Sequence, residues 1–278
     1  MSTARIPCIL KVQPWFRDHA VGGKIVLPAV ETMLLLAAEC RKVQPEADIA
    51  TMEDVRFGKF LEIPETAANV DILVEYAATD DGRIQTKLLS HKQLATMTRI
   101  KEHGEVFFPA RGATIRQEIP AEVDPTPPSG TVKKISVDHI YLHMVPFGKC
   151  YQTLQGTLLL SESLAWGHLL APELPCTYPG ATLLGSPFPL DGALHAACVL
   201  GQQFVDFPPF PVGFAKRTIL RPTQAGASYT TRVKLTSLAD AELVFDLQVF
   251  DRHGQLYESV SEVRMRDVRR ALTTTYKH

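Results

Sequence analysis

One arrangement of segments occurs twice along the chain: an apolar segment of helical length, then several shorter segments that alternate apolar and polar residues. The first copy predicts a helix over 28–43 and strands over 55–63, 70–77, 83–91 and 96–108. The second copy predicts a helix over 191–204 and strands over 212–220, 228–235, 243–251 and 256–266. Such a repeat constrains the fold strongly, because each copy must bury the same kind of apolar surface in the same way.

Turn residues and prolines divide the two copies. Asp80-Asp81-Gly82 and residues 251–254 supply matching hairpin turns. Four prolines between positions 120 and 130 disfavour both helix and sheet there, so this stretch is predicted to be a linker. We therefore predict an α+β fold in which two antiparallel sheets each curl around one apolar helix. The predicted units are 1–120 and 131–278, joined by 121–130; one large domain with accidental internal similarity is the alternative.

Composition excludes several classes of protein. The 278 residues carry 29 basic and 30 acidic side chains, so the net charge of −1 gives no reason to expect a nucleic-acid partner. No apolar run approaches the ~20 residues that span a bilayer, and residues 1–11 lack the features of a secretory signal. We therefore expect a cytoplasmic protein without a membrane partner.

The cysteines and histidines give no sign of a metal site. The five cysteines are scattered and form no CxxC pair, which fits reduced thiols in a cytoplasm. His139 and His143 are spaced by one helical turn, but no third ligand lies near them in the sequence. The cysteines are Cys8, Cys40, Cys150, Cys176 and Cys198.

Polar residues stand at the start of both predicted helices. His19 precedes the first helix, Asp191 opens the second, and His195 lies one turn after Asp191 on the same face. Taken singly, each fits a structural histidine or a helix cap. A two-fold repeat brings equivalent helix starts together, and a neutral imidazole can then serve as a base. Apolar neighbours at 188–190 disfavour the charged form of Asp191, so the two residues would form an acid/base pair.

These residues also form recognisable motifs. His19, Gly23 and Pro28 are spaced as in the HxxxGxxxxP motif of polyketide synthase dehydratase domains. Asp191 and His195 resemble the DxxxQ/H motif of the same family.

Two further segments carry the same resemblance. Residues 147–152 (Phe-Gly-Lys-Cys-Tyr-Gln) are similar to the family's YGPxFQ segment, and residues 210–213 fall where the family has LPxx. The four motifs follow the family's order and spacing over about residues 10–270. The chain thus resembles a polyketide synthase dehydratase domain.

The resemblance implies a double hotdog fold and the dehydration of a β-hydroxyacyl thioester. The substrate would be carried on the phosphopantetheine of acyl carrier protein, alongside other synthase components, with no bound cofactor or metal. His19 would remove the α-proton, Asp191 would protonate the departing hydroxyl, and His195 would orient Asp191. A backbone N–H at the start of the first helix, near Ala29, would stabilise charge on the thioester oxygen. The implied substrate-binding residues are Gly23, Pro28, Ala29, Phe147, Gly148, Tyr151 and Gln152.

The chain departs from the family pattern at three places. Phe147 replaces the first aromatic of the motif and so lacks its hydroxyl, Lys149 replaces the proline, and Ser186 replaces the histidine of a His-Pro pair. These departures suggest an unusual substrate or a divergent branch. Two alternatives stay open: an aldol cyclase like the product-template domains, and a non-catalytic scaffold that only binds a carrier protein. A monomer and a homodimer are equally compatible with the sequence.

Overall fold

The strands form one antiparallel sheet. The computed structural model describes residues 3–93, 98–110, 123–174, 179–239 and 242–268, and within them twelve strands are joined in a single sheet. In order across the N-terminal half these are β1 (Thr3–Lys11), β5 (Asn69–Ala78), β6 (Ile84–Gln93), β7 (Thr98–Phe108) and β4 (Thr51–Phe57). The C-terminal half continues with β11 (Phe210–Ile219), β14 (Leu256–Arg266), β13 (Glu242–Asp251), β12 (Ser228–Ala239), β10 (Leu164–Leu170), β9 (Leu154–Leu160) and β8 (Lys133–Ser136).

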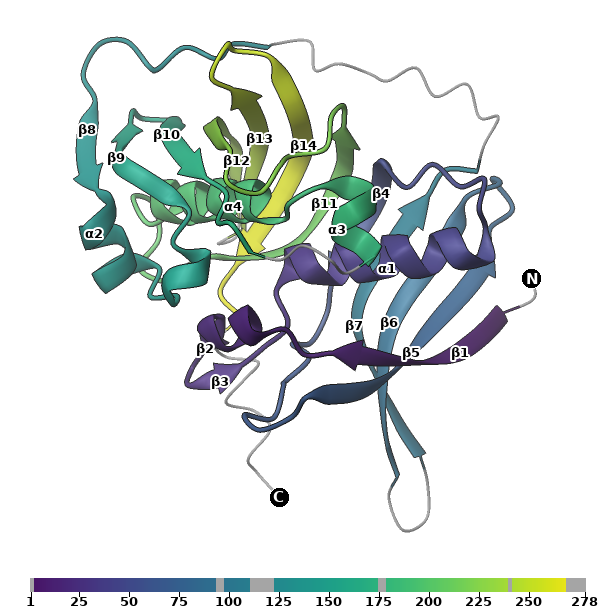
Figure 1. Ribbon diagram of the computed structural model, residues 1–278. Coiled ribbons are helices and arrows are strands. Elements are labelled where there is room, and N and C mark those ends of the chain that lie inside the picture. The colour runs from purple at the N-terminus through teal and green to yellow at the C-terminus, as the bar shows by residue number, and fades with distance from the viewer. Residues whose placement is uncertain (1–2, 94–97, 111–122, 175–178, 240–241, 269–278) are drawn as a thin grey trace.

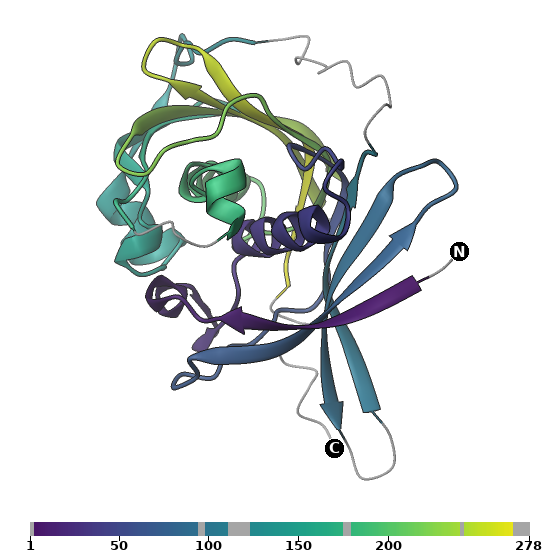
Figure 2. The ribbon, with the colours of Figure 1, turned by 45° about the vertical axis from the view of Figure 1, so that its right-hand side comes forward.

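Two apolar helices lie against the concave side of this sheet. Helix α1 (Ala29–Val43) belongs to the N-terminal half and α4 (Phe188–Gly201) to the C-terminal half, and the two contact each other (Figures 1 and 2). Every residue of α4 is buried, as expected of a helix that is apolar on all sides. Each half of the sheet curves around its own helix, which confirms the predicted double hotdog.

Short elements fill the connections between the long ones. They are η1 (Pro14–Asp18), β2 (Ala20–Val21), β3 (Lys24–Ile25), α2 (Val137–His139), η2 (Ile140–Met144), η3 (Lys149–Tyr151) and α3 (Pro179–Leu184). Among the described residues, no helix combines the length and the apolar composition that crossing a membrane would take.

The two predicted sheets are joined edge to edge into one continuous sheet. Strands β4 and β11 pair directly, with Gly213 opposite Arg56. A Cβ at Gly213 would lie 2.3 Å from the carbonyl oxygen of Val55, so a residue without a side chain is needed for the strands to approach. The joint leaves no free edge between the halves.

Several element boundaries differ from the prediction. Helix α4 begins at Phe188, three residues early, because Pro189 is tolerated in the first turn of a helix, where its missing N–H has no partner. Asp191 therefore lies within the first turn and does not cap the helix. Strand β7 is continuous: its register to β6 shifts between Leu88 and Leu89, and the resulting bulge lies at His103.

The linker region has no regular structure where it is described. Residues 123–132 contain neither helix nor strand, and Pro120 lies outside the described residues. The division at 120 and 130 stays a prediction. Strands β1, β8, β9 and β10 were not expected from the sequence, since their apolar residues do not alternate cleanly.

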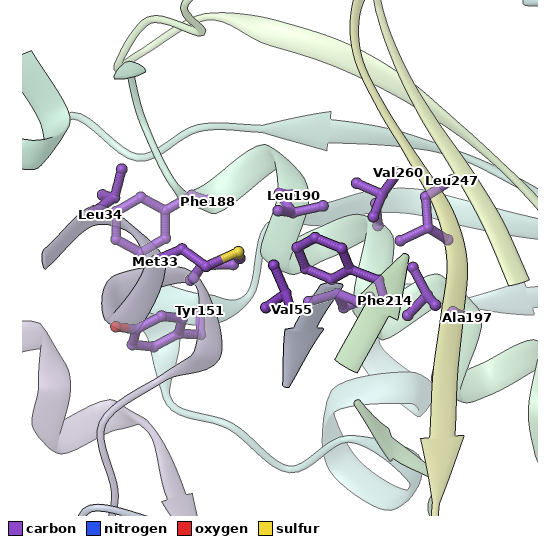
Figure 3. Close-up of a cluster of buried hydrophobic side chains, with 14 of the residues drawn as sticks. Met33, Leu34, Val55, Tyr151, Phe188, Leu190, Ala197, Phe214, Leu247 and Val260 are labelled. Atoms are coloured by element: carbon purple, nitrogen blue, oxygen red, sulfur yellow. The ribbon is translucent and has the colours of Figure 1, made fainter. Parts of the chain in front are cut away.

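A continuous core passes from one half to the other. Figure 3 shows Met33 of α1 and Val55 of β4 beside Leu190 of α4 and Phe214 of β11. These buried side chains come from both copies of the repeat, so neither half completes its core alone.

A buried ion pair lies within this shared core. The Arg217 Nε donates to Glu258 Oε1 at 2.6 Å, and both side chains are at most 3% exposed. The same guanidinium contacts the sulfur atoms of Met33 and Met52, which belong to the N-terminal half. Within the described ranges Arg217 and Glu258 are each other's ion-pair partner, and the guanidinium otherwise contacts thioether sulfur atoms.

Removing one member of this pair is expected to destabilise the fold strongly. Glu258→Gln leaves a buried guanidinium without its counter-charge and should lower the free energy of unfolding by about 3–5 kcal/mol in urea titrations. The matched control is Glu102→Gln, which breaks the more exposed pair with Lys87 and should cost at most about 1 kcal/mol. Equal costs for the two variants would contradict the importance of the buried pair.

Candidate active site

His19 is held by a reciprocal pair of hydrogen bonds to Val26. The residue follows η1 and precedes β2, and its carbonyl accepts the Val26 N–H at 3.1 Å. The ring Nδ1 lies 3.2 Å from the Val26 carbonyl oxygen, which can only accept. Nδ1 therefore carries a hydrogen in the neutral ring, and Nε2 keeps a lone pair. This is the form of imidazole that can take a proton from a substrate.

Burial keeps His19 uncharged. Its side chain is buried, and desolvation lowers its pKa from 6.5 to about 4. The nearby Asp191 carboxylate raises the pKa and so opposes part of this shift, while His195 lowers it further. At neutral pH the ring is therefore a free base in a largely apolar environment.

Asp191 and His195 lie one turn apart on α4. Asp191 Oδ2 is 3.1 Å from His195 Nε2, and both side chains are buried. The ring N–H direction misses the oxygen, so neither atom has a hydrogen bond of good geometry within the described part of the chain. Two buried polar atoms thus retain the capacity to bind a polar ligand, which is unusual in a folded protein.

One cavity is shared by His19, Asp191 and His195. Its volume is about 500 Å³, and both halves of the chain contribute to its wall. His19, Asp191 and His195 all line it, so the structure brings together the three polar residues singled out in the sequence. Most of the remaining wall is apolar; its larger side chains include Phe57, Phe60, Leu61, Met144, Phe147, Leu194, Phe210 and Met265. A cavity of this kind suits an acyl chain with a reactive polar end.

Phe147 contacts both histidines. Its ring is stacked on His19 with centroids 4.3 Å apart, and it lies 5.2 Å from the ring of His195. Asp18 fixes this contact: its backbone carbonyl accepts the Gly148 N–H at 2.7 Å, and its carboxylate accepts the Cys150 N–H at 2.9 Å. The segment that carries His19 is thereby tied to the segment that carries Phe147.

Only part of the expected substrate-binding set lines the cavity. Ala29 and Phe147 do so. Gly23 lies in the turn between β2 and β3 and lines a separate pocket beside Arg17 and Glu62. Pro28 precedes α1 and does not line the cavity, although its neighbours Leu27 and Ala29 do.

Gly148, Tyr151 and Gln152 lie behind the wall instead of in it. A Cβ at Gly148 would lie 2.5 Å from the Asp18 side chain, so this glycine allows close packing. Tyr151 is fully buried between the rings of His19 and Phe188. The Gln152 side chain donates to the Phe147 carbonyl at 2.9 Å. All three position neighbours of the cavity, which corrects the expectation of direct contact.

Other contributors were missed in the sequence. Asp18, Val26 and Tyr141 each fix a residue of the cavity, yet none belongs to the motifs used above. Adjacency to His19 was the one available signal for Asp18. Within the described residues, no three His, Cys, Asp or Glu side chains gather as a metal site would require; Cys176 lies outside them.

The lowered pKa of His19 predicts a pH-dependent stability. Below pH 6.5 the unfolded chain binds a proton at His19 that the native state refuses until about pH 4. The free energy of unfolding should therefore fall as pH decreases through this window and be independent of His19 above it. Between pH 7 and pH 5 the loss from this residue is on the order of 2 kcal/mol. His19→Gln should remove that loss in urea titrations, whereas the exposed control His139→Gln should not; equal pH dependence in both would contradict a buried neutral ring.

The chain is similar to known protein families and to curated proteins. It matches the family described as the polyketide synthase dehydratase domain over residues 8–91, and the one described as the polyketide synthase dehydratase N-terminal domain over residues 110–274. Among curated proteins, it is 20% identical over 220 residues to the highly reducing polyketide synthase tazB of Aspergillus terreus, covering 66% of this chain and 8% of that protein. It is 27% identical over 204 residues to the spectinabilin polyketide synthase system protein NorA of Streptomyces orinoci, covering 70% of this chain and 10% of that protein. The chain thus spans about a tenth of the length of these relatives.

Solved structures share the fold at low sequence identity. A trans-AT polyketide synthase dehydratase domain from Brevibacillus brevis superposes with a TM-score of 0.71 at 17% identity, covering 95% of this chain and 93% of that one. The dehydratase domain from the CurJ module of curacin polyketide synthase gives a TM-score of 0.67 at 18% identity, covering 95% and 91%. The family matches cover most of the sequence, and the fold agrees with them. The chain belongs to the polyketide synthase dehydratase family, whose members catalyse the dehydration of β-hydroxyacyl thioesters.

Proposed function

We propose that this chain removes water from a β-hydroxyacyl thioester, with His19 as the base and Asp191 as the acid. One observation carries the proposal: a neutral imidazole from one half and a carboxyl from the other line the same apolar cavity. A base and an acid on one cavity are what a β-elimination of water requires.

The elimination needs only these two side chains to balance. His19 Nε2 takes the α-proton, and the electrons of that C–H bond form the double bond to the β-carbon. The bond from the β-carbon to oxygen breaks as the Asp191 carboxyl gives its proton to that oxygen, and water leaves. His19 then holds a proton and Asp191 a negative charge. Transfer of one proton back to the carboxylate restores both groups.

Helix α1 is placed to stabilise the charge that develops on the thioester. No side chain caps this helix, and its first intrahelical bond is donated by Thr32 to Pro28. The N–H group of Ala29 therefore has no partner within the helix. Ala29 lines the cavity beside His19, so its N–H is the candidate donor to the thioester oxygen.

The surroundings of the cavity suit a substrate delivered on a long arm. Dehydratase domains of this family act on substrates bound to acyl carrier protein. The exposed lining residues Gly22, Gly58 and Lys59 lie where the cavity reaches the surface. We place the phosphopantetheine arm there, with the acyl chain against the aromatic wall. The free thiols Cys8, Cys40, Cys150 and Cys198 are consistent with the cytoplasmic setting that the sequence suggests.

Substitution of either proposed catalytic residue should abolish water loss. His19→Ala removes the base and Asp191→Asn removes the acidic proton, so each should lower kcat by at least about 100-fold. The assay incubates the full chain with a β-hydroxyacyl thioester on acyl carrier protein and follows the enoyl product by mass spectrometry. Circular dichroism and melting temperature check that the variants are folded.

Matched controls come from the neighbouring exposed pair Asp138 and His139, which lies outside the cavity. Asp138→Asn and His139→Ala should leave the rate unchanged. Activity retained by either site variant would overturn the assigned roles. Cyclisation of a poly-β-ketone thioester, with no enoyl product from the β-hydroxyacyl substrate, would favour the aldol cyclase. A folded wild-type chain that binds carrier protein but transforms neither substrate would favour the scaffold.

A further inference from the structure

A buried tyrosine contacts His195 on the side of the ring that faces away from Asp191. Tyr141 belongs to the short π-helical segment η2, and the residue is 7% exposed. Its hydroxyl lies 3.3 Å from His195 Nδ1, and the two rings meet edge to face with centroids 5.8 Å apart. The Leu154 backbone N–H donates to the same hydroxyl at 3.0 Å. Tyr141 does not line the cavity.

These contacts have a direction. The Leu154 N–H can only donate, so the Tyr141 oxygen accepts from it and keeps its own hydrogen to give. His195 Nδ1 is an acceptor in reach of that hydrogen, and the Thr153 side chain also interacts with the hydroxyl. A neutral imidazole that accepts at Nδ1 carries its hydrogen on Nε2, the nitrogen that lies 3.1 Å from Asp191 Oδ2.

The alternative tautomer would interfere with the proposed acid. With a lone pair on Nε2, His195 would accept the proton of the Asp191 carboxyl and compete for it with the substrate hydroxyl. With a hydrogen on Nε2, the same nitrogen cannot accept the proton of the Asp191 carboxyl, which leaves the acidic proton for the substrate. The ring nitrogen of His195 that carries the hydrogen thus decides whether the Asp191 proton is available to the substrate.

We propose that Tyr141 is a positioning residue that holds His195 in the tautomer with hydrogen on Nε2, and so keeps the Asp191 proton available to the substrate. The inference rests on the proposed function of Asp191. Phe147 at the cavity wall has no hydroxyl, and Tyr141 supplies a buried hydroxyl that acts through His195.

Nuclear magnetic resonance can determine the tautomer of His195 without any substrate. In the full chain labelled with ¹⁵N-histidine, long-range proton–nitrogen spectra at pH 7 should show His195 with hydrogen on Nε2, assigned by its loss in His195→Gln. In Tyr141→Phe the signal should move toward the Nδ1 form or toward a mixture. A wild-type His195 with hydrogen on Nδ1, or a tautomer that Tyr141→Phe does not change, would overturn the proposal.

Kinetics separates positioning from packing. Tyr141→Phe should lower kcat by about tenfold with KM little changed, because the acid step alone is affected. A glutamine amide donates from nitrogen and accepts at oxygen, so it needs no tautomer. In a His195→Gln background the same Tyr141→Phe change should therefore cost less than about twofold. Equal losses in both backgrounds would show that the hydroxyl matters only for packing.

A second tyrosine supplies the matched control. Tyr229 is also buried, and its hydroxyl accepts the Gln224 N–H at 2.7 Å, away from the cavity. Tyr229→Phe removes the same kind of bond and should leave kcat and the His195 spectrum unchanged. A comparable loss of kcat in this control would contradict a specific role for Tyr141. A wild-type chain that dehydrates no β-hydroxyacyl thioester would refute the proposed function, while the tautomer reading would still decide the state of His195.

Discussion

Two halves of the chain can serve one cavity only because they share a single core. The pairing of β4 with β11 makes the sheet continuous, and α1 and α4 pack against each other beneath it. Within this core Arg217 of the C-terminal half lies against methionines of the N-terminal half and is neutralised by Glu258. The starts of the two helices are thereby fixed relative to one another. His19 and Asp191 owe their common cavity to that constraint and not to any direct bond between them.

The polar residues of the cavity are set by their backbone surroundings. Val26 fixes the ring of His19, and burial keeps that ring neutral. Asp18 ties the His19 segment to the Phe147 segment, so that one aromatic ring touches both histidines. In each case a donor or acceptor outside the cavity determines what a group inside it can do. The chemistry therefore depends on residues that never meet the substrate.

Much of the fold could be read from the sequence, because hydrophobic periodicity is a local signal. Strands β5, β6, β13 and β14 lie within a few residues of their predicted bounds, since they alternate clearly and end at Gly-containing turns. Strands β8 to β10 were missed because their burial is decided by what packs on them. The joint at Gly213 could not be predicted either, since only the approach of β4 makes a glycine necessary there.

The sequence predicted which polar residues share a cavity better than it predicted what their neighbours contact. The spacing of His19, Asp191 and His195 pointed to one cavity, and all three line it. Three motif residues lie one layer behind the cavity wall: Gly148, Tyr151 and Gln152. A motif shows the type and spacing of residues, and it does not show which atoms they contact. Tyr141 carried no signal, since its role arises from a hydroxyl that meets His195 across the fold.

A structure of the Asp191→Asn variant with a β-hydroxyacyl-pantetheine thioester bound would test the pairing of base and acid most directly. The bound substrate should place its α-carbon about 3–3.5 Å from His19 Nε2, with the β-hydroxyl at the side chain of position 191. An acyl chain that lies outside the cavity, or one whose α-carbon faces away from His19, would contradict the proposed elimination.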